Sequence, residues 1–163
     1  MDLHADDLAA LLDGLGIEAA HIGGTSYGAE ISMVFALKYP ERTKSLIVTS
    51  AVSQVDPILQ GLIGGWIAAA RAKDAALFYQ TVYPLTFSEA WIAANGALLN
   101  QAKERYNTID FEAMLELLLS FSKLFITGYL AKIGAQTLVA TGAWDLLNRR
   151  RYWEIFAREI PVA

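Results

Sequence analysis

Apolar side chains recur at helical spacing near the start of the chain. They stand at i, i+3, i+4 and i+7, the spacing of one face of an α-helix, and the positions are Leu8, Leu11, Leu12 and Leu15. Gly14 and Gly16 lie where such a helix should end, because glycine is common just beyond helix C-termini. The pattern predicts a short helix that buries its leucine face.

Two apolar runs on either side of a second helix have the texture of β-strands. Residues 17–24 form a short run that ends in glycines, with the strand itself expected at about 19–23. Residues 29–39 are apolar almost all round, which predicts a buried helix, and Pro40 closes it. Residues 45–50 form an unbroken run rich in β-branched side chains, as in a parallel strand that is buried on both faces.

The middle of the chain, residues 56–132, has helical patterns and no convincing strand. Asp56 is followed by proline, the order of an N-cap and a first helical position. Asp110 is a second candidate N-cap, and Thr86 with Glu89 has the spacing of a capping box. These signals predict a block made of helices alone.

Strand texture returns at residues 136–141, and a helix is predicted from about 150 to 160. Strands that alternate with helices predict an α/β fold with a parallel sheet, here with its three strands in chain order. The chain then divides into a core segment, 1–54, an inserted helical block, 55–132, and a return to the core, 133–163.

Composition narrows the classes of function. Of 163 residues, 55% are apolar and 18% charged, against about 45–50% and about 25% in ordinary soluble domains. The absence of cysteine and the presence of only two histidines leave few ligands for zinc or copper, so we expect no metal and no cofactor. With a net charge of -4 and a pI of about 5.1, the chain lacks the basic surface that nucleic-acid binding needs.

The apolar excess does not predict a membrane span. Its longest runs are interrupted by polar residues and glycines before they reach the roughly 20 residues that a spanning helix needs. The first residues, Met1-Asp2-Leu3-His4, do not have the pattern of a signal peptide. We therefore expect a cytoplasmic protein.

One motif carries chemistry, Gly24-Thr25-Ser26-Tyr27-Gly28, which fits G-x-S-x-G. It follows a predicted strand and opens a predicted helix, the setting of a nucleophile elbow. The tight turn requires small residues at Gly24 and Gly28 and holds Ser26 in a strained backbone conformation. The helix N-terminus favours negative charge, and the N–H of Tyr27 points to where an oxyanion would form. The alternative is a glycine-rich turn whose serine has no role.

Around this motif the sequence resembles the α/β-hydrolase superfamily. The resemblance is strongest over residues 7–50; besides the motif it rests on Leu15-Gly16-Ile17, Tyr39-Pro40-Glu41-Arg42 and Ser45-Leu46-Ile47-Val48. Residues 133–145 resemble the strand and turn that deliver the family's catalytic acid. The resemblance implies a partial α/β-hydrolase fold, a short parallel sheet with flanking helices and an inserted helical cap.

The same resemblance implies roles for two side chains, Ser26 as nucleophile and Asp145 as the acid that orients a histidine. It implies a serine hydrolase acting on an ester- or amide-like acyl bond of a small molecule. The family's order is serine, acid, histidine, but the only histidines here, His4 and His21, precede Ser26. His21 lies on the predicted strand about 16 Å before Ser26, too far to activate it.

We therefore expect the catalytic histidine and the family's early strands to lie outside this chain, and the truncated chain to self-associate through its bare sheet edges. Two other functions stay open: a non-catalytic module that keeps the fold for binding or signalling, and an acyltransferase that shares the elbow. Asp145 is alternatively a simple turn acid. Glu30, in the first turn after the motif, is interpreted as a charge that favours the helix dipole, or as a substrate contact.

Overall fold

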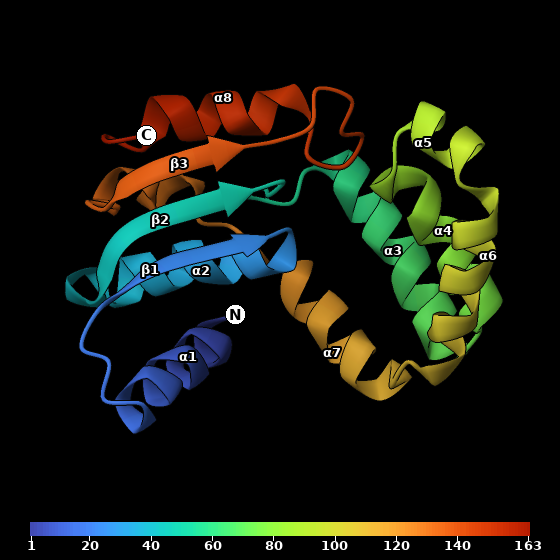
Figure 1. Cartoon of the computed structure of the whole chain (residues 1–163), viewed down its shortest axis with the longest axis horizontal. Helices are drawn as coiled ribbons and strands as arrows, with labels where there is room; N and C mark the ends of the chain where they lie inside the picture. Colours follow the sequence, from blue (N-terminus) through green and yellow to red (C-terminus); the bar gives the residue numbers. More distant parts are fainter. The chain divides into compact units, whose positions relative to one another are not determined.

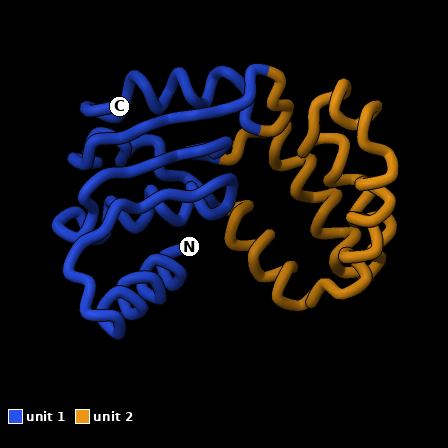
Figure 2. The backbone as a smooth tube through the Cα atoms, in the orientation of Figure 1, with its two compact units in different colours: residues 1–54, 124–143, 148–163 blue, residues 55–123, 144–147 orange.

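The computed structural model describes residues 1–163, which form two compact units. The sheet unit contains residues 1–54, 124–143 and 148–163, and the helical unit contains residues 55–123 and 144–147; Figure 2 colours them separately. None of the helices combines the length and the apolar character that a membrane crossing requires.

Strands and helices alternate in the sheet unit (Figure 1). In chain order its elements are α1 (Asp2–Gly14), β1 (Ala20–Thr25), α2 (Tyr27–Lys38), the 3₁₀ turn η1 (Pro40–Arg42), β2 (Thr43–Thr49), η3 (Thr127–Lys132), β3 (Gln136–Ala140) and α8 (Arg150–Glu159). The three strands are parallel and lie in the order β1-β2-β3, which confirms the predicted α/β fold and strand order. Gly24 pairs with Val48, and Thr49 pairs with Ala140, so all three strands end at the same edge.

Only one face of this sheet is well covered. Ile22, Leu46 and Val48 are buried on the face against which α2 packs. On the other face, Ile47 and Leu138 lie in register and are 41% and 60% exposed. The expectation that residues 45–50 are buried on both sides is therefore wrong. A continuous apolar run is typical of a doubly covered strand, but nothing within the sheet unit covers this second face at Ile47 and Leu138.

The first helix buries a different stripe from the one its leucines predict. Ala5, Ala9 and Leu12 are buried, at i, i+4 and i+7, whereas Leu11 and Leu15 are 57% and 63% exposed. Small alanines allow α1 to pack closely against α2 and β1, in a cluster that includes Ile22, Val34 and Phe35. The leucine pattern located the helix but not its buried face.

Arg42 ties the end of α1 to the strand that follows. Its guanidinium donates to the carbonyls of Glu18 at 3.1 Å, Ile17 at 3.0 Å and Ala9 at 3.4 Å, and forms an ion pair with Asp13 at 2.7 Å. A rigid fork of donors suits this role, because one guanidinium can bond several carbonyls and a carboxylate at the same time.

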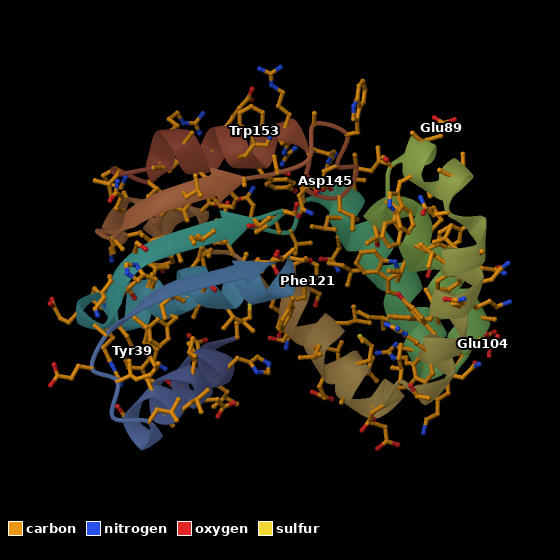
Figure 3. The ribbon with its side chains drawn as sticks, in the orientation of Figure 1. Tyr39, Glu89, Glu104, Phe121, Asp145 and Trp153 are labelled. Carbon is orange, nitrogen blue, oxygen red and sulfur yellow. The ribbon has the colours of Figure 1, made fainter.

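A second tie joins α1 to the far end of α2. Asp6 accepts hydrogen bonds from the hydroxyl of Tyr39, labelled in Figure 3, and from the ammonium of Lys38. These two donors hold the pKa of Asp6 below its ordinary value, with Lys38 the larger cause.

The helical unit is built from α3 (Pro57–Arg71), α4 (Ala75–Thr86), α5 (Glu89–Ala94), α6 (Gly96–Arg105), η2 (Tyr106–Thr108) and α7 (Phe111–Phe121). Asp56 and Asp110 cap α3 and α7 with hydrogen bonds to backbone N–H groups, as predicted. The predicted capping box of Thr86 and Glu89 is wrong: Ser88 caps α5, and Thr86 ends α4. Helices α4 and α7 both pack against α3.

Candidate active site

Ser26 is the single residue between β1 and α2, and its backbone has a conformation that L-residues rarely adopt. Its φ is 53° and its ψ is -127°, and it is exposed. The N–H of Ser26 donates to the carbonyl of Thr49 at 2.9 Å, and its own carbonyl accepts from Ala29 and Glu30 at 2.8 and 3.1 Å. Such strain costs roughly 1–3 kcal/mol and persists only where the surroundings fix it. The strand–turn–helix geometry predicted for the motif is therefore present.

The two glycines of the motif differ in their steric roles. A Cβ on Gly24 would lie 2.3 Å from the carbonyl carbon of Gly28 and 2.6 Å from the nitrogen of Ala29. A Cβ on Gly28 would meet nothing within 4 Å. The prediction that both positions must lack bulk holds for Gly24, because β1 passes directly over the backbone of the first helical turn. It is wrong for Gly28, whose Cβ would point into open space.

Tyr27 is the first residue of α2, so its backbone N–H belongs to the turn that carries the helix's positive partial charge. The ring of Tyr27 contacts the ring of His4, from the first turn of α1, with centroids 5.8 Å apart and planes at 81°. The fold therefore brings His4, which sequence reasoning set aside, next to the residue that follows Ser26. His21 instead bonds Ser45 Oγ through Nδ1 at 2.7 Å, a pair between neighbouring strands.

Asp145 lies in the turn that follows β3 and belongs to the helical unit, whereas Ser26, Tyr27, Gly24 and Gly28 belong to the sheet unit. Asp145 is half-buried, and its Oδ1 accepts the N–H of Leu147 at 3.0 Å. Because β1 and β3 are parallel strands of one sheet, the segments that carry Ser26 and Asp145 both leave it at the carboxyl edge.

A cavity of about 510 Å³ lies within the helical unit, and its lining includes the two sequence neighbours of Asp145 but not Asp145 itself. Its walls are mostly apolar and come from two segments; they are Pro84, Phe87, Ser88, Glu89, Ala90 and Ile92 on one side and Trp144 and Leu146 on the other. Trp144 is 83% exposed. Figure 3 labels Asp145 and Glu89. Glu89 is the one charged residue of the lining.

Glu30 is the residue whose environment the sequence interpretation missed. Its side chain is 1% exposed, and Oε1 accepts the backbone N–H of Val52 at 3.3 Å. Burial raises the pKa of Glu30 to about 8, and the Val52 hydrogen bond opposes this rise without cancelling it. A carboxylate that only complements a helix dipole would remain in solvent. The signal that could have identified it is the apolar character of 29–39 all round, which leaves Glu30 no polar face.

The structure contains no group of three or more histidine, aspartate or glutamate side chains placed to share a metal ion.

Comparison with known proteins decides the family. The sequence profile of the α/β hydrolase fold matches residues 1–162. The chain belongs to the α/β-hydrolase fold family. The resemblance seen in residues 7–50 and 133–145 is thereby confirmed. The match to the family also covers the residues of the helical unit.

Two sequence relatives are proteins called RutD, whose names provisionally describe carbamate hydrolases. RutD of Azorhizobium caulinodans is 30% identical over 98% of this chain and 61% of its own length. RutD of Caulobacter sp. (strain K31) is 28% identical over 97% of this chain and 60% of its own. The chain thus spans about 60% of the length of these relatives.

Among solved structures, the α/β hydrolase MGS-M2 from a Medee basin deep-sea metagenome library superposes with a TM-score of 0.92 at 26% identity, covering 98% of this chain and 60% of that one. The enol-lactonase of Burkholderia xenovorans LB400 has a TM-score of 0.87 at 18% identity, with 98% and 60% coverage. The second likeness shows the fold alone.

Proposed function

We propose that this chain carries the nucleophile and acid of a serine hydrolase that cleaves an ester- or amide-like acyl bond of a small molecule. The observation that carries the proposal is Ser26 at φ 53°, exposed between a strand end and the first turn of α2. A strained serine at that position has its Oγ lifted away from the sheet and near backbone donors.

Each residue of the proposed site has one task. Ser26 Oγ attacks the substrate carbonyl, and its proton passes to a histidine that later donates it to the leaving group. The backbone N–H of Tyr27 stabilises the oxyanion of the tetrahedral intermediate. Asp145 orients the histidine and stabilises its charged form. Water then hydrolyses the acyl-enzyme and regenerates Ser26.

Neither of the two histidines among residues 1–163 is assigned as the base. His21 is engaged by Ser45, and His4 is in contact with the Tyr27 ring. In the proposed mechanism the base is a histidine that residues 1–163 do not supply. Without it, Ser26 keeps its proton and is a poor nucleophile.

The cavity lined by Trp144 and Leu146 is suited to binding an apolar group of the substrate. Its lining is mostly apolar, and the carboxylate of Glu89 disfavours a second negative charge there. The name of the relatives RutD describes the hydrolysis of a carbamate, which supports the same class of bond. We propose a neutral ester, lactone or carbamate with an apolar substituent as substrate.

The test replaces the matching 60% of MGS-M2 by residues 1–163, so that the flanking segments of that hydrolase complete the fold. We expect the chimera to hydrolyse p-nitrophenyl esters, with activity reduced at least 10³-fold by Ser26→Ala and by Asp145→Asn. Ser122→Ala, which removes a hydroxyl after α7, is the matched control and should retain activity. The 163-residue chain by itself should show no more than trace hydrolysis.

The alternative is a non-catalytic binding module that keeps the α/β-hydrolase fold without a complete triad. A folded chimera that is inactive while the parent MGS-M2 is active would favour that alternative. Robust turnover by the chain alone, abolished by Ser26→Ala, would instead point to His4 or to a base from another chain.

A further inference from the structure

Glu30 combines three properties that are unusual together. It is a charged residue type with 1% exposure, it lies in the first turn of the helix that Ser26 opens, and it has one unsatisfied oxygen. Oε1 accepts the N–H of Val52, but the buried Oε2 has no hydrogen-bond partner. Carboxylates are almost never fully buried unless they are paired, so this one needs an explanation beyond packing.

The segment that Glu30 binds, residues 50–53, is a junction of the sheet unit. Ser50 has a φ of 47°, and its N–H donates to the carbonyl of Ala140 at the end of β3. Ser53 accepts the N–H of Ile126 at 2.8 Å through its carbonyl and bonds Thr127 Oγ1 at 2.7 Å through its hydroxyl. The preceding residue, Thr49, accepts the N–H of Ser26 at 2.9 Å. Residues 49–53 thus contact the nucleophile turn, the end of β3 and residues 126–127.

No other charge compensates Glu30. The elements packed most closely against α2 are α1, β1, η1, β2 and η3. Their titratable groups are Asp2, His4, Asp6, Asp7, Asp13, His21, Glu41, Arg42, Lys44, Tyr129 and Lys132. None of them contributes to the pKa of Glu30, whose causes are burial and the Val52 N–H alone.

We propose that the Glu30 carboxyl is a latch for residues 50–53: its neutral form holds this loop on the first turn of α2, and its ionisation releases the loop. Glu30 is then a positioning residue for the Ser26 turn, through the Ser26–Thr49 hydrogen bond. Only this last consequence rests on the proposed function; the latch itself does not.

Ionisation should release the loop because the buried Oε2 of Glu30 has no hydrogen-bond partner. A neutral carboxyl offers its carbonyl oxygen to the Val52 N–H and places no charge in the apolar interior. Loss of the proton to solvent leaves a charge whose second oxygen has no donor, and an unpaired buried charge is far more costly than an unpaired neutral group. The least costly relief is for residues 50–53 to move and admit water to Oε2.

Hydrogen exchange of the full 163-residue chain, followed by mass spectrometry with residue-level fragmentation, tests the latch. After correction for the intrinsic pH dependence of exchange, we expect protection at Val52 to fall at least tenfold between pH 6.5 and 9.5. Protection of the amides within β2 should change less than twofold. Constant protection at Val52 across this range overturns the proposal, and this measurement needs no variant.

Two substitutions sharpen the result. Glu30→Gln keeps an acceptor and cannot ionise, so its Val52 protection should match the wild type at pH 6.5 and stay constant to pH 9.5. Glu41→Gln, at an exposed glutamate of η1, is the matched control and should retain the wild-type fall. A fall that persists in Glu30→Gln overturns the proposal.

In the MGS-M2 chimera, Glu30→Gln should remove a loss of kcat above about pH 8 and leave KM within twofold. A chimera that lacks activity while Val52 still titrates contradicts the proposed function and leaves the latch standing. An active chimera whose alkaline profile is unchanged by Glu30→Gln overturns the positioning role.

Discussion

Gly24 and Gly28 meet so closely that a methyl group on Gly24 would lie 2.3 Å from the carbonyl carbon of Gly28. The contact is between two backbones, which cannot move aside as a side chain can. It fixes the distance between β1 and α2 at the turn where Ser26 has its strained conformation. Gly28 contributes its backbone to this contact and has open space beyond its own Cα.

This asymmetry predicts different outcomes for two alanine substitutions. Gly24→Ala should destabilise the chain by about 3 kcal/mol, the upper part of the range for overpacking. Gly28→Ala should change the free energy of unfolding by less than about 1 kcal/mol, because alanine fits helical backbone and fills open space. Urea unfolding of both variants measures this; equal losses would contradict the steric argument.

Arg42 should contribute more to the free energy of unfolding than an ordinary surface arginine, because its guanidinium bonds three carbonyls as well as Asp13. We expect Arg42→Ala to cost about 2–3 kcal/mol, since hydrogen bonds to charged groups are stronger than neutral ones. Arg42→Lys should recover only part of this, because lysine lacks the fork. The control is Arg158→Ala, whose side chain is 70% exposed and whose loss should cost less than about 0.5 kcal/mol. Thermal and urea unfolding would distinguish them.

Glu30 should make stability depend on pH in a defined direction. Its pKa is raised to about 8 in the folded chain and is about 4.3 when unfolded. Between these values the folded state holds a proton that the unfolded state has lost, so unfolding releases a proton and stability falls as pH rises. Relative to Glu30→Gln, the free energy of unfolding should fall by up to about 1.4 kcal/mol per pH unit between about pH 5 and 8.

The measurement for this prediction is urea unfolding of both proteins at pH 5, 6, 7 and 8. Comparison with Glu30→Gln cancels the contributions of other titrating groups. Below about pH 4 the difference should be constant, since both states are then protonated. A difference that is constant throughout, or that rises with pH, would contradict the buried neutral carboxyl.

The open face of the sheet predicts self-association of the isolated chain. Ile47 and Leu138 are exposed side by side there, and the outer edges of β1 and β3 have no strand beside them. Exposed apolar patches and strand edges favour association. Ile47→Lys with Leu138→Lys should reduce association in sedimentation velocity, whereas Leu3→Lys, at an even more exposed apolar position on α1, should not. A monomeric wild type with a sharp, cooperative thermal transition would show the prediction to be wrong.

Local signals in the sequence identified the elements that depend on nearby residues. The caps at Asp56 and Asp110 and the strand–turn–helix at Ser26 follow from spacing within a few positions, whereas the parallel sheet followed from the alternation of strands and helices. The capping box at Thr86 was wrong because Ser88, two residues later, offers a better cap for the same helix. The catalytic roles of Ser26, Tyr27 and Asp145 stay predictions, as does the role of the helical unit as a cap.

By itself the sequence determined the order of strands and helices, the family and the position of the elbow, because periodicity, turn sterics and motif are properties of short segments. The tertiary structure alone decided which face of the sheet stays open, which stripe of α1 is buried, and that Glu30 is buried beside Val52 with a raised pKa. Each of these depends on a contact between residues far apart in the chain, and burial and pKa are properties of the surroundings that such contacts create.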